Sequence, residues 1–466
     1  MFPEEFRKRI KLQEYINDDA LFRALEEPSP VSIRINPQKW IRQPMNAEPV
    51  PWCKDGFYLD FRPSFTADPL FHSGCYYPQE ASSMFLEQVF IQTIGNKECI
   101  RALDLCGAPG GKSTHLSALI GDRGFLVANE VIRTRVAILS ENITKWGIGN
   151  TIVTNNDPSA FGNLKGYFDV IVVDAPCSGE GMFRDPIAVR EWSPGKTLLC
   201  AQRQKRILTD IWPALKEGGI LIYSTCTFNP AENEENVKWL ATKEKAECLI
   251  PDKAQFNDIK DIDYQGITGY GFYPGKTKGE GFFISVIRKT KKTGEIQIKN
   301  LKNPFKRLNK EDLITADKWT VFSKENLVSS GNDVYSVAGN INDYLFLSQN
   351  CKIIKGGTRI CSVKNKKIIP YHEMALSTGL RKEAFFTAEL DYNQAVSYLR
   401  RDNMVLPDLP KGWLIVTYKG VNLGFINNIG NRINNYYPVE WRIRMSIPEG
   451  SKEKILNWIT DGKSIT

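Results

Sequence analysis

Short apolar runs alternate with helical stretches between about residues 76 and 290. The apolar runs occupy 102–105, 125–128, 151–154, 169–173 and 219–223. Between them, apolar side chains recur at helical spacing and predict helices over 113–120, 133–146 and 196–215. Buried strands that alternate with helices in this rhythm indicate βαβ units. The pattern predicts a Rossmann-like, doubly wound α/β domain with a parallel sheet and helices on both faces.

The two ends of the chain have other patterns. Residues 1–75 begin with apolar side chains at helical spacing and continue into Pro-rich and aromatic-rich segments, which predicts a small α+β cap. Residues 316–466 are strand-rich, and Lys419-Gly420 joins two apolar runs as in a β-hairpin. We therefore expect the cap, an α/β domain over 76–290, a linker over 291–315, and a separate, mostly β region over 316–466.

The length and composition predict a multidomain protein with reduced thiols. A chain of 466 residues has room for roughly two to four domains. Its start is acidic where a signal peptide is basic, and no apolar run approaches the ~18 residues of a membrane helix. The ten cysteines form no Cys-x-x-Cys pair and there are three histidines, so we expect no metal site and no disulfides. We predict a cytoplasmic monomer without a membrane partner.

Positive charge is concentrated in one stretch. The net charge of the chain is +8, and between residues 288 and 310 a single acid, Glu295, stands among many basic residues. The basic residues are Arg288, Lys289, Lys291, Lys292, Lys299, Lys302, Lys306, Arg307 and Lys310. Such a stretch is typical of a solvated linker. Phosphate binding is the more specific alternative.

A glycine-rich turn follows the first apolar run of the α/β domain. It comprises Cys106, Gly107, Ala108, Pro109, Gly110, Gly111 and Lys112. In a doubly wound sheet, ligands bind at the carboxyl ends of the strands, where glycines let the backbone approach closely. Spacing excludes a P-loop, because that motif needs a glycine where Cys106 stands, and Gly107 is one position too close. The turn therefore predicts a cofactor site.

Two acidic residues follow the next two strands. Glu130 closes the second apolar run, at about the distance where an acid binds a ribose diol. Asp157 lies just past the third run, where it would reach the adenine side. The alternative is that the glycines merely form a tight turn and that both acids are ordinary caps. Because both stand at strand ends beside the turn, we expect both to bind the cofactor.

Two cysteines follow the fourth and fifth strands. Cys177 lies three residues after Asp174, and Cys226 follows Ser224-Thr225. Structural cysteines prefer the apolar interior, whereas these two stand among polar residues at the same rim as the cofactor turn. One such cysteine alone would be interpreted as a small buried residue. Two cysteines at the same rim instead predict a catalytic function.

A thiol at this rim suits methylation of cytosine carbon 5. Carbon 5 does not attack a methyl sulfonium directly, but a thiolate that adds to carbon 6 makes carbon 5 nucleophilic. An acid near ring nitrogen 3 would offset the charge that develops, a role that Asp174 could fill. Lys112 could orient the ring or lower the pKa of a thiol. A base must later remove the proton on carbon 5.

Segments 104–112, 174–181 and 223–227 resemble motifs of the Nop/Sun family of RNA cytosine-5 methyltransferases. Pro176-Cys177 and Thr225-Cys226 match the Pro-Cys and Thr-Cys contexts that mark this family. The resemblance extends through 32–37 and 77–84, hence over most of residues 1–290. Its small departure is Gly107, where the family more often has alanine.

The resemblance implies roles for individual residues. In the family the Thr-Cys residue attacks carbon 6 and the Pro-Cys residue assists product release, which implies these roles for Cys226 and Cys177. It implies that 106–112, Glu130, Asp157 and Asp174 bind S-adenosylmethionine, and that Asp174 also faces the cytosine.

The C-terminal region has a less specific resemblance. Segments 423–425, 434–438 and 440–444 are similar to the tail of bacterial RsmF-type members, which methylate small-subunit ribosomal RNA and carry a PUA-like module. We place this module at about 385–450. Its aromatic and arginine side chains would bind RNA or, equally, form a packed β core with a charged face.

The resemblance implies an RNA cytosine-5 methyltransferase, with small-subunit ribosomal RNA as the expected substrate. Transfer RNA and large-subunit ribosomal RNA are alternatives, and the target base must be unstacked. An adenine N6 methyltransferase is one rival, but its site would have an aromatic residue in place of Cys177. An inactive ribosome-assembly factor is another, but it would not need the two cysteines.

Overall fold

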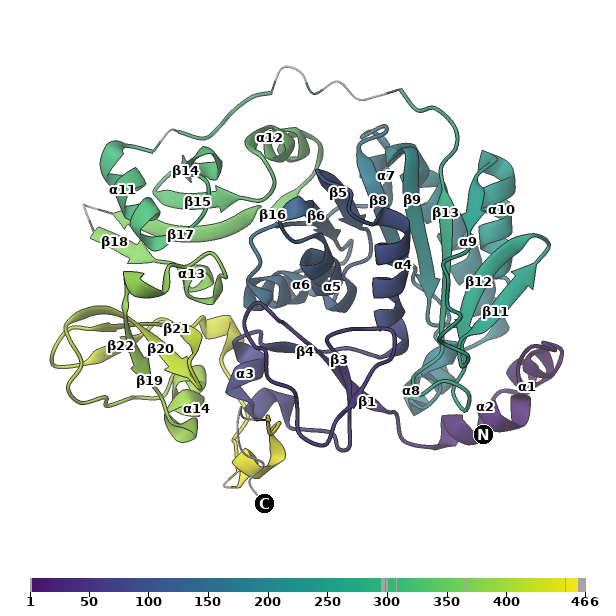
Figure 1. Ribbon diagram of the computed structural model, residues 1–466, viewed down its shortest axis with the longest axis horizontal. Helices are drawn as coiled ribbons and strands as arrows, with labels where there is room; N and C mark the ends of the chain where they lie inside the picture. Colours follow the sequence, from purple (N-terminus) through teal and green to yellow (C-terminus); the bar gives the residue numbers. More distant parts are fainter. Residues whose placement is uncertain are drawn as a thin grey trace.

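The computed structural model describes residues 2–294, 298, 301–306, 308–364, 367–448 and 450–459. Within these ranges the chain forms one large central sheet and three four-stranded sheets (Figure 1). No helix in this part of the chain has the length and apolar character needed to cross a bilayer.

The N-terminal cap is α+β, as predicted. Its helices are α1 (Glu4–Lys11), α2 (Asp18–Glu26) and α3 (Pro69–His72). Its strands are β1 (Val31–Ile35), β2 (Glu48–Pro49), β3 (Gly56–Leu59) and β4 (Tyr76–Pro78), which pair antiparallel in the order β2-β3-β1-β4. The apolar spacing at the start of the chain buries Phe6 and Ile10 on α1, whereas Leu12, just past that helix, is exposed.

Five parallel strands form the middle of the central sheet. They are β5 (Ile100–Asp104), β6 (Gly124–Asn129), β7 (Thr151–Thr154), β8 (Phe168–Asp174) and β9 (Leu215–Thr225). Their order is β9-β8-β5-β6-β7, so the chain moves outward from β5 in both directions. This is the doubly wound arrangement that the alternating pattern predicts.

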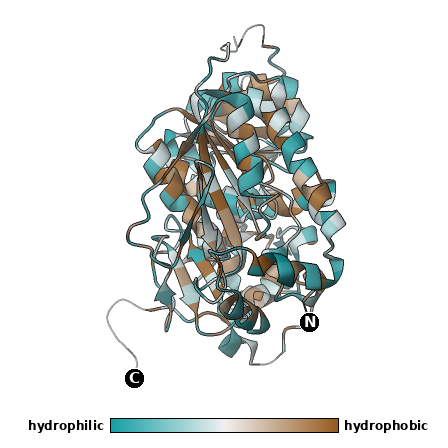
Figure 2. Cartoon of the chain, turned by 90° about the vertical axis from the view of Figure 1, so that its right-hand side faces the viewer, coloured by the Kyte–Doolittle hydropathy of each residue, from teal (hydrophilic) through white to brown (hydrophobic). Residues whose placement is uncertain are grey.

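Helices cover both faces of this sheet. One face packs on α4 (Leu86–Ile94), α5 (Gly111–Ile120) and α6 (Arg133–Trp146), and the other on α7 (Pro158–Gly162), α9 (Pro194–Ile211) and α10 (Glu234–Glu244). Successive strand residues point to opposite faces, so Ala102 lies in one core and Leu103 in the other. The middle parts of the strands are mostly apolar because both faces are covered (Figure 2).

Antiparallel strands extend the sheet at both edges. Beyond β9 lie β13 (Phe282–Arg288), β12 (Ile267–Phe272) and β11 (Lys260–Tyr264), and β10 (Glu247–Leu249) also pairs with β13. At the opposite edge, β16 (Ile353–Lys355) pairs with β7. A strand from the C-terminal half therefore completes the central sheet. The sequence predicted a separate C-terminal region and did not predict this strand.

The helix predicted over 196–215 ends earlier than predicted. α9 stops at Ile211, a 3-10 turn covers Trp212–Ala214, and Leu215 already belongs to β9. Pro213 explains the difference, because it has no backbone N–H to continue the helical hydrogen bonds. The short helix α8 (Pro186–Glu191) precedes α9 and was not predicted.

The basic stretch is not a uniform linker. Arg288 ends β13, and the buried ammonium of Lys289 donates to the carbonyls of Trp212 and Leu215. Burial lowers the pKa of Lys289 to about 8. Lys310 begins α11 (Lys310–Trp319). Lys299, Arg307 and the single acid Glu295 lie outside the described residues.

The C-terminal half contains two mixed modules, so the prediction of a mostly β region is incomplete. The middle module, residues 310–376, has the sheet β14-β15-β17-β18 together with α11, α12 (Ile341–Asn350) and α13 (His372–Leu376). Its strands are β14 (Leu327–Ser330), β15 (Asp333–Val337), β17 (Gly357–Lys364) and β18 (Lys367–Pro370). Between α12 and β17, this module contributes β16 to the central sheet.

The C-terminal module has the sheet β19-β20-β21-β22. Its elements are β19 (Phe386–Glu389), α14 (Tyr392–Arg400), β20 (Gly412–Tyr418), β21 (Val421–Asn428) and β22 (Ile433–Asn435). The hairpin predicted around Lys419-Gly420 is confirmed, since β20 and β21 pair antiparallel across it.

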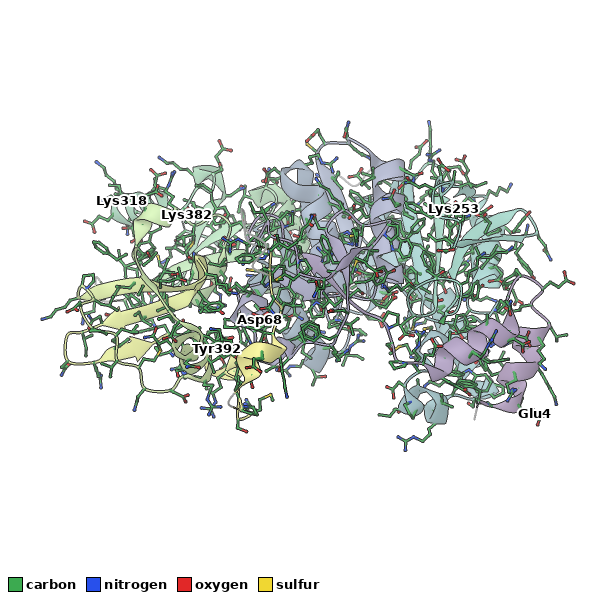
Figure 3. The ribbon with its side chains drawn as sticks, turned by 60° about the horizontal axis from the view of Figure 1, so that its bottom comes forward. Glu4, Asp68, Lys253, Lys318, Lys382 and Tyr392 are labelled. Atoms are coloured by element: carbon green, nitrogen blue, oxygen red, sulfur yellow. The ribbon has the colours of Figure 1, made fainter. Side chains whose placement is uncertain are left out.

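The cap and the C-terminal module share one core. Ile33 and Leu70 of the cap pack in the same apolar cluster as Tyr398 and Leu414. At this junction the Tyr392 hydroxyl donates to the carbonyl of Ala67, and Figure 3 shows Tyr392 beside Asp68, far from Glu4. The two ends of the chain therefore hold each other in place against the central domain.

Arg34 of β1 fastens the cap to α5. Its side chain is 2% exposed, and the guanidinium donates to Gln79 Oε1 at 2.9 Å and to Thr114 Oγ1 at 2.7 Å. The same group lies 4.5 Å from the centre of the Trp146 ring. Buried cations of this kind are stable only with such a complete set of partners.

Replacing Arg34 with Met should destabilise the protein by about 3 kcal/mol, because Gln79 and Thr114 would lose their buried partner. Urea unfolding followed by intrinsic fluorescence measures this change. Arg62→Met is the control, since Arg62 is exposed and lies 5.9 Å from the Phe65 ring. Its cost should stay below about 1 kcal/mol. Equal losses in the two variants would contradict the role given to Arg34.

Candidate active site

A cavity of about 1050 Å³ lies at the carboxyl ends of the parallel strands. The segments that follow β5, β6, β7, β8 and β9 all contribute to its wall, and α9 contributes Leu199, Arg203 and Arg206. The carboxyl-end rim is where doubly wound sheets bind ligands. Both predicted cysteines line this one cavity.

The thiols of Cys177 and Cys226 are in direct contact. The two sulfur atoms are 2.8 Å apart, and the backbone N–H of Cys226 donates to Cys177 Sγ at 3.3 Å. The hydrogen bond to Cys226 raises the pKa of the Cys177 thiol well above its ordinary value, and burial raises it further. Cys177 therefore keeps its proton.

Asp174 lies at the end of β8, beside the thiols. Its carboxylate accepts hydrogen bonds from Lys112 Nζ at 2.9 Å and from Ser224 Oγ at 2.8 Å. Burial disfavours the Lys112 ammonium, but the carboxylate of Asp174 outweighs burial and raises the pKa of Lys112. The direct partner of Lys112 is Asp174, so the two functions predicted for Lys112, orienting the ring and lowering the pKa of a thiol, stay predictions.

The glycine-rich turn divides into two groups of residues. Cys106 and Ala108 line the cavity, together with Glu130, Asp157 and Asp174. Gly107, Pro109, Gly110 and Gly111 shape the turn and are not among its lining residues, and Lys112 reaches the cavity through Asp174.

Close packing explains the glycine at position 107. A Cβ atom there would lie 2.6 Å from Ser113 Oγ, which donates to Asp104 Oδ2 at 2.6 Å. Gly110 has a φ of 126°, which favours glycine. These positions let α5 start directly behind the cavity.

The residues around Glu130 suit an adenosine group. Glu130 is buried, with one carboxylate oxygen accepting from the Ile132 N–H and the other 3.3 Å from Arg135. Next to it, Val131 and Ile132 are 53% and 48% exposed although both are apolar, and both line the cavity. A carboxylate can accept hydrogen bonds from a ribose diol, and the apolar surface beside it can pack against a purine. These residues therefore fit S-adenosylmethionine.

Asp157 has a structural role in addition to its place on the wall. Its side chain accepts from the Ser159 N–H as the N-cap of α7, and it lies 3.5 Å from Arg206. The capping alternative therefore describes Asp157 correctly, and the residue also lines the cavity.

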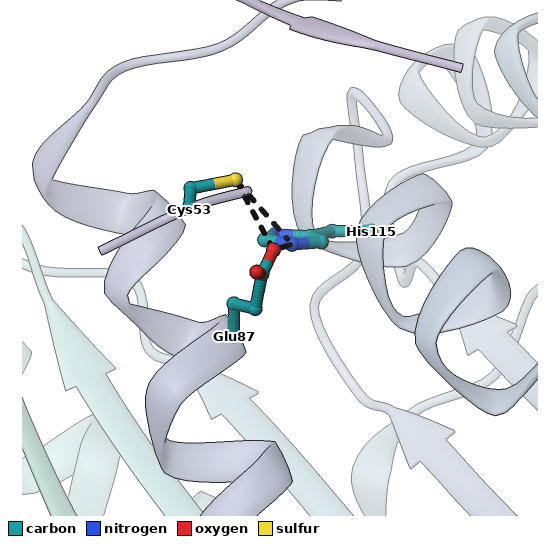
Figure 4. A group of neighbouring side chains, drawn as sticks. All are labelled: Cys53, Glu87 and His115. Atoms are coloured by element: carbon teal, nitrogen blue, oxygen red, sulfur yellow. Dashed lines mark hydrogen bonds and ion pairs between the residues drawn. The ribbon is translucent and has the colours of Figure 1, made fainter. Parts of the chain in front are cut away.

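A buried polar cluster lies apart from this cavity (Figure 4). Cys53, Glu87 and His115 bring three potential metal ligands within 4.8 Å, although the sequence has no metal-binding spacing. Glu87 already accepts from the Cys53 thiol at 3.2 Å, from His115 at 3.0 Å and from the Lys54 N–H. Burial lowers the pKa of His115 to about 4, so the ring is neutral. We interpret the cluster as a hydrogen-bond network that joins α4 to α5.

Comparison with known proteins identifies the family of this chain. Residues 91–288 match the model of 16S rRNA methyltransferase RsmB/F, residues 2–81 match the N-terminal domain of 16S rRNA methyltransferase RsmF, and residues 385–443 match the methyltransferase RsmF PUA domain. Ribosomal RNA small subunit methyltransferase F of Klebsiella pneumoniae is 31% identical, over 94% of this chain and 96% of the relative. The Aliivibrio fischeri protein of that name is 32% identical, over 94% and 97%. The chain belongs to the ribosomal RNA small subunit methyltransferase F family.

Solved structures share the fold of this family member. A methyltransferase homolog from Pyrococcus horikoshii has a TM-score of 0.52 at 29% identity, over 62% of this chain and 95% of that one. NSun6 from the same organism, solved with SFG, has a TM-score of 0.52 at 22% identity, over 62% and 99%, and shows the fold alone. The predicted resemblance, the methyltransferase fold and the PUA-like module are confirmed, and the chain is a methyltransferase.

Glu232 is a residue of this RsmF-type site that the sequence did not suggest. Its buried carboxylate accepts from the Ser178 N–H at 2.8 Å, from Ser178 Oγ at 2.5 Å and from Gln204. Ser178 Oγ is in turn 2.9 Å from Thr227 Oγ1. Because Ser178 follows Cys177 and Thr227 follows Cys226, the carboxylate links the two cysteine loops. Burial raises the pKa of Glu232 to about 7.

Replacing Glu232 with Ala should slow methyl transfer by about tenfold or more, because the thiols would lose their alignment. The direct readout is the rate at which diamide cross-links Cys177 to Cys226, measured by mass spectrometry, which should also fall. Glu234→Ala is the matched control: Glu234 is buried nearby but accepts from the Tyr15 hydroxyl. If both variants cross-link and turn over alike, Glu232 does not position the thiols.

Proposed function

We propose that this chain methylates carbon 5 of a cytosine in small-subunit ribosomal RNA, with S-adenosylmethionine as methyl donor and Cys226 as covalent nucleophile. The observation that carries the proposal is the contact of Cys177 with Cys226 on the wall of a cavity that Glu130 and Asp174 also line. The family membership and the names of the relatives support ribosomal RNA as the substrate.

Catalysis begins when Cys226 Sγ adds to carbon 6 of the flipped-out base. The new sulfur–carbon bond pushes an electron pair of the ring toward carbon 5. Asp174, held by Lys112 and Ser224, stands beside the base, and the Lys112 ammonium offsets the negative charge that develops there. S-adenosylmethionine, which Glu130 and the apolar side chains of Val131 and Ile132 would hold, would supply an electrophilic methyl group for carbon 5 and leave as the neutral sulfide.

Release of the product uses the second thiol. A base must take the proton from carbon 5 so that the electron pair can expel Cys226 as a thiolate. The hydrogen bond to Cys226 keeps the pKa of Cys177 high, and this hydrogen bond is lost once Cys226 is bonded to the base. The adduct therefore lowers the pKa of Cys177, so that this thiol can release its proton to solvent and then take the proton from carbon 5 as a thiolate.

Cys226→Ala should reduce methyl transfer by at least a factor of about 10³, because no other group can activate carbon 5. Incorporation of labelled methyl groups into ribosomal RNA measures the rate, and calorimetry should show cofactor binding close to that of the unchanged protein. Cys200→Ala is the control, since Cys200 is buried on α9 and is not among the cavity-lining residues. Full activity in Cys226→Ala would refute the nucleophile assignment.

Cys177→Ala should trap the adduct, because Cys226 would still add to the base but could not leave efficiently. A slowly migrating protein–RNA species should accumulate in denaturing gels, and it should be absent when Cys226 is also replaced. Binding of RNA without such a species would remove Cys177 from the release step.

The substrate is tested in cells. Bisulfite sequencing of ribosomal and transfer RNA, with and without the gene, should show a 5-methylcytosine in small-subunit RNA that depends on the gene. A dependent site only in transfer RNA or in large-subunit RNA would contradict the proposed substrate but leave the chemistry intact.

A further inference from the structure

A second cavity, of about 340 Å³, lies in the middle module. β15, β17 and α12 contribute to its wall, and Ser140 of α6 belongs to the central domain. The three matched family models cover 2–81, 91–288 and 385–443, so none of them includes the middle module. The methyl-transfer chemistry proposed above does not use this cavity.

The wall of this cavity combines aromatic rings with cations. Tyr335, Tyr344 and Phe305 line it, and the rings of Phe305 and Tyr344 are 5.3 Å apart. The exposed guanidinium of Arg359, also in the wall, lies 5.7 Å from the centre of the Tyr335 ring. Half-buried aromatic faces beside an arginine plane are the surface on which single-stranded bases stack.

The described part of the basic stretch runs along this cavity. Phe305 lies in the wall, its neighbour Lys306 is exposed, and the Lys306 backbone bonds to Ser329, next to the lining residue Ser330. Lys302 is exposed as well, and its carbonyl accepts from Gln349 of α12. Positive charge therefore flanks the aromatic wall, as a phosphate backbone requires.

The cavity is close to the catalytic cavity. Arg135 lines the catalytic cavity and Ser140 lines the second one, and both belong to α6. Five residues of helix correspond to about 8 Å along its axis. On the other side, Ile353 of the second cavity pairs with Thr154, which ends the strand leading to Asp157. One nucleic-acid strand can thus reach both cavities.

We propose that the middle-module cavity binds a base and the adjoining phosphates of single-stranded RNA beside the target nucleotide. This inference rests on the proposed function in one respect, that the substrate is RNA. It assigns Lys302 and Lys306 of the basic stretch to phosphate binding, the more specific of the two hypotheses that the sequence left open.

The test is a Tyr335→Ala/Arg359→Ala double variant of the full chain. Binding is measured by fluorescence anisotropy with a fluorescein-labelled oligocytidylate of ten nucleotides. The Kd should rise about tenfold, because one stacked base is lost. In turnover with ribosomal RNA, KM should rise similarly while kcat at saturating RNA stays unchanged. Lys302→Ala/Lys306→Ala should weaken binding and flatten its dependence on salt.

The control is Tyr264→Ala/Arg288→Ala, a tyrosine and an arginine on β11 and β13, at the opposite edge of the central sheet. Equal Kd values in the control and the test variant would overturn the proposal. So would unchanged oligonucleotide binding with weaker binding to small ribosomal subunits, since the cavity would then contact protein. If the Kd rises as expected but Cys177→Ala forms no RNA adduct, the cavity proposal stands and the catalytic mechanism fails.

Discussion

The pairing of β8 with β9 determines where the two thiols meet. Asp174 and Ser224 are partners in register at the carboxyl ends of these strands, and the Ser224 hydroxyl donates to the Asp174 carboxylate. Cys177 follows three residues after the first, and Cys226 two residues after the second. A shift of the register by one residue would turn the strand side chains to the other face and separate the sulfur atoms. The active site therefore depends on backbone pairing inside the sheet, where both faces are covered and register is strongly specified.

The rest of the molecule supports this rim from the outside. Arg34 ties the cap to α5, which carries Lys112, and Lys112 holds Asp174. The cap in turn shares its core with the C-terminal module, so the PUA-like module has a fixed place relative to the catalytic cavity. At the edge away from β9, β16 binds the middle module to β7 through backbone hydrogen bonds. Modules from distant regions of the sequence are thus attached to one central sheet.

Local sequence patterns predicted much of this fold, and the misses have a common cause. The strand over Thr151–Thr154 and the helix over Arg133–Trp146 have the predicted bounds, because each is buried by its own apolar pattern. β16 was missed because it is three residues long and its partner lies some two hundred positions earlier. Lys289 was assigned to a solvated stretch, although its ammonium satisfies two buried carbonyls that no sequence pattern reveals.

For the site as well, the sequence predicted some residues and missed others. Motif position alone identified Cys177, Cys226, Glu130 and Asp174, since residues after parallel strands meet at one rim. Glu232 could not be found in this way. Its carboxylate accepts hydrogen bonds from Ser178 and so links the two cysteine loops, and this contact exists only in the folded protein. The glycines of the turn were assigned to the cofactor as a group, but close packing on Ser113 accounts for Gly107. Spacing predicts which residues reach a rim; it does not distinguish those that line a cavity from those that shape it.

In the mechanism proposed above, the short distance between the sulfur atoms of Cys177 and Cys226 determines the order of the steps. Two thiolates 2.8 Å apart would repel each other by several kcal/mol even at the effective dielectric constant of a protein surface, so at most one of them is ionised at a time. In the proposed mechanism Cys177 is the thiol that keeps its proton, and Cys226 is the one that attacks carbon 6. When Cys226 forms the bond to carbon 6, the reason for Cys177 to keep its proton disappears. A single contact can therefore select the nucleophile first and prepare the base afterwards, without movement of the protein backbone.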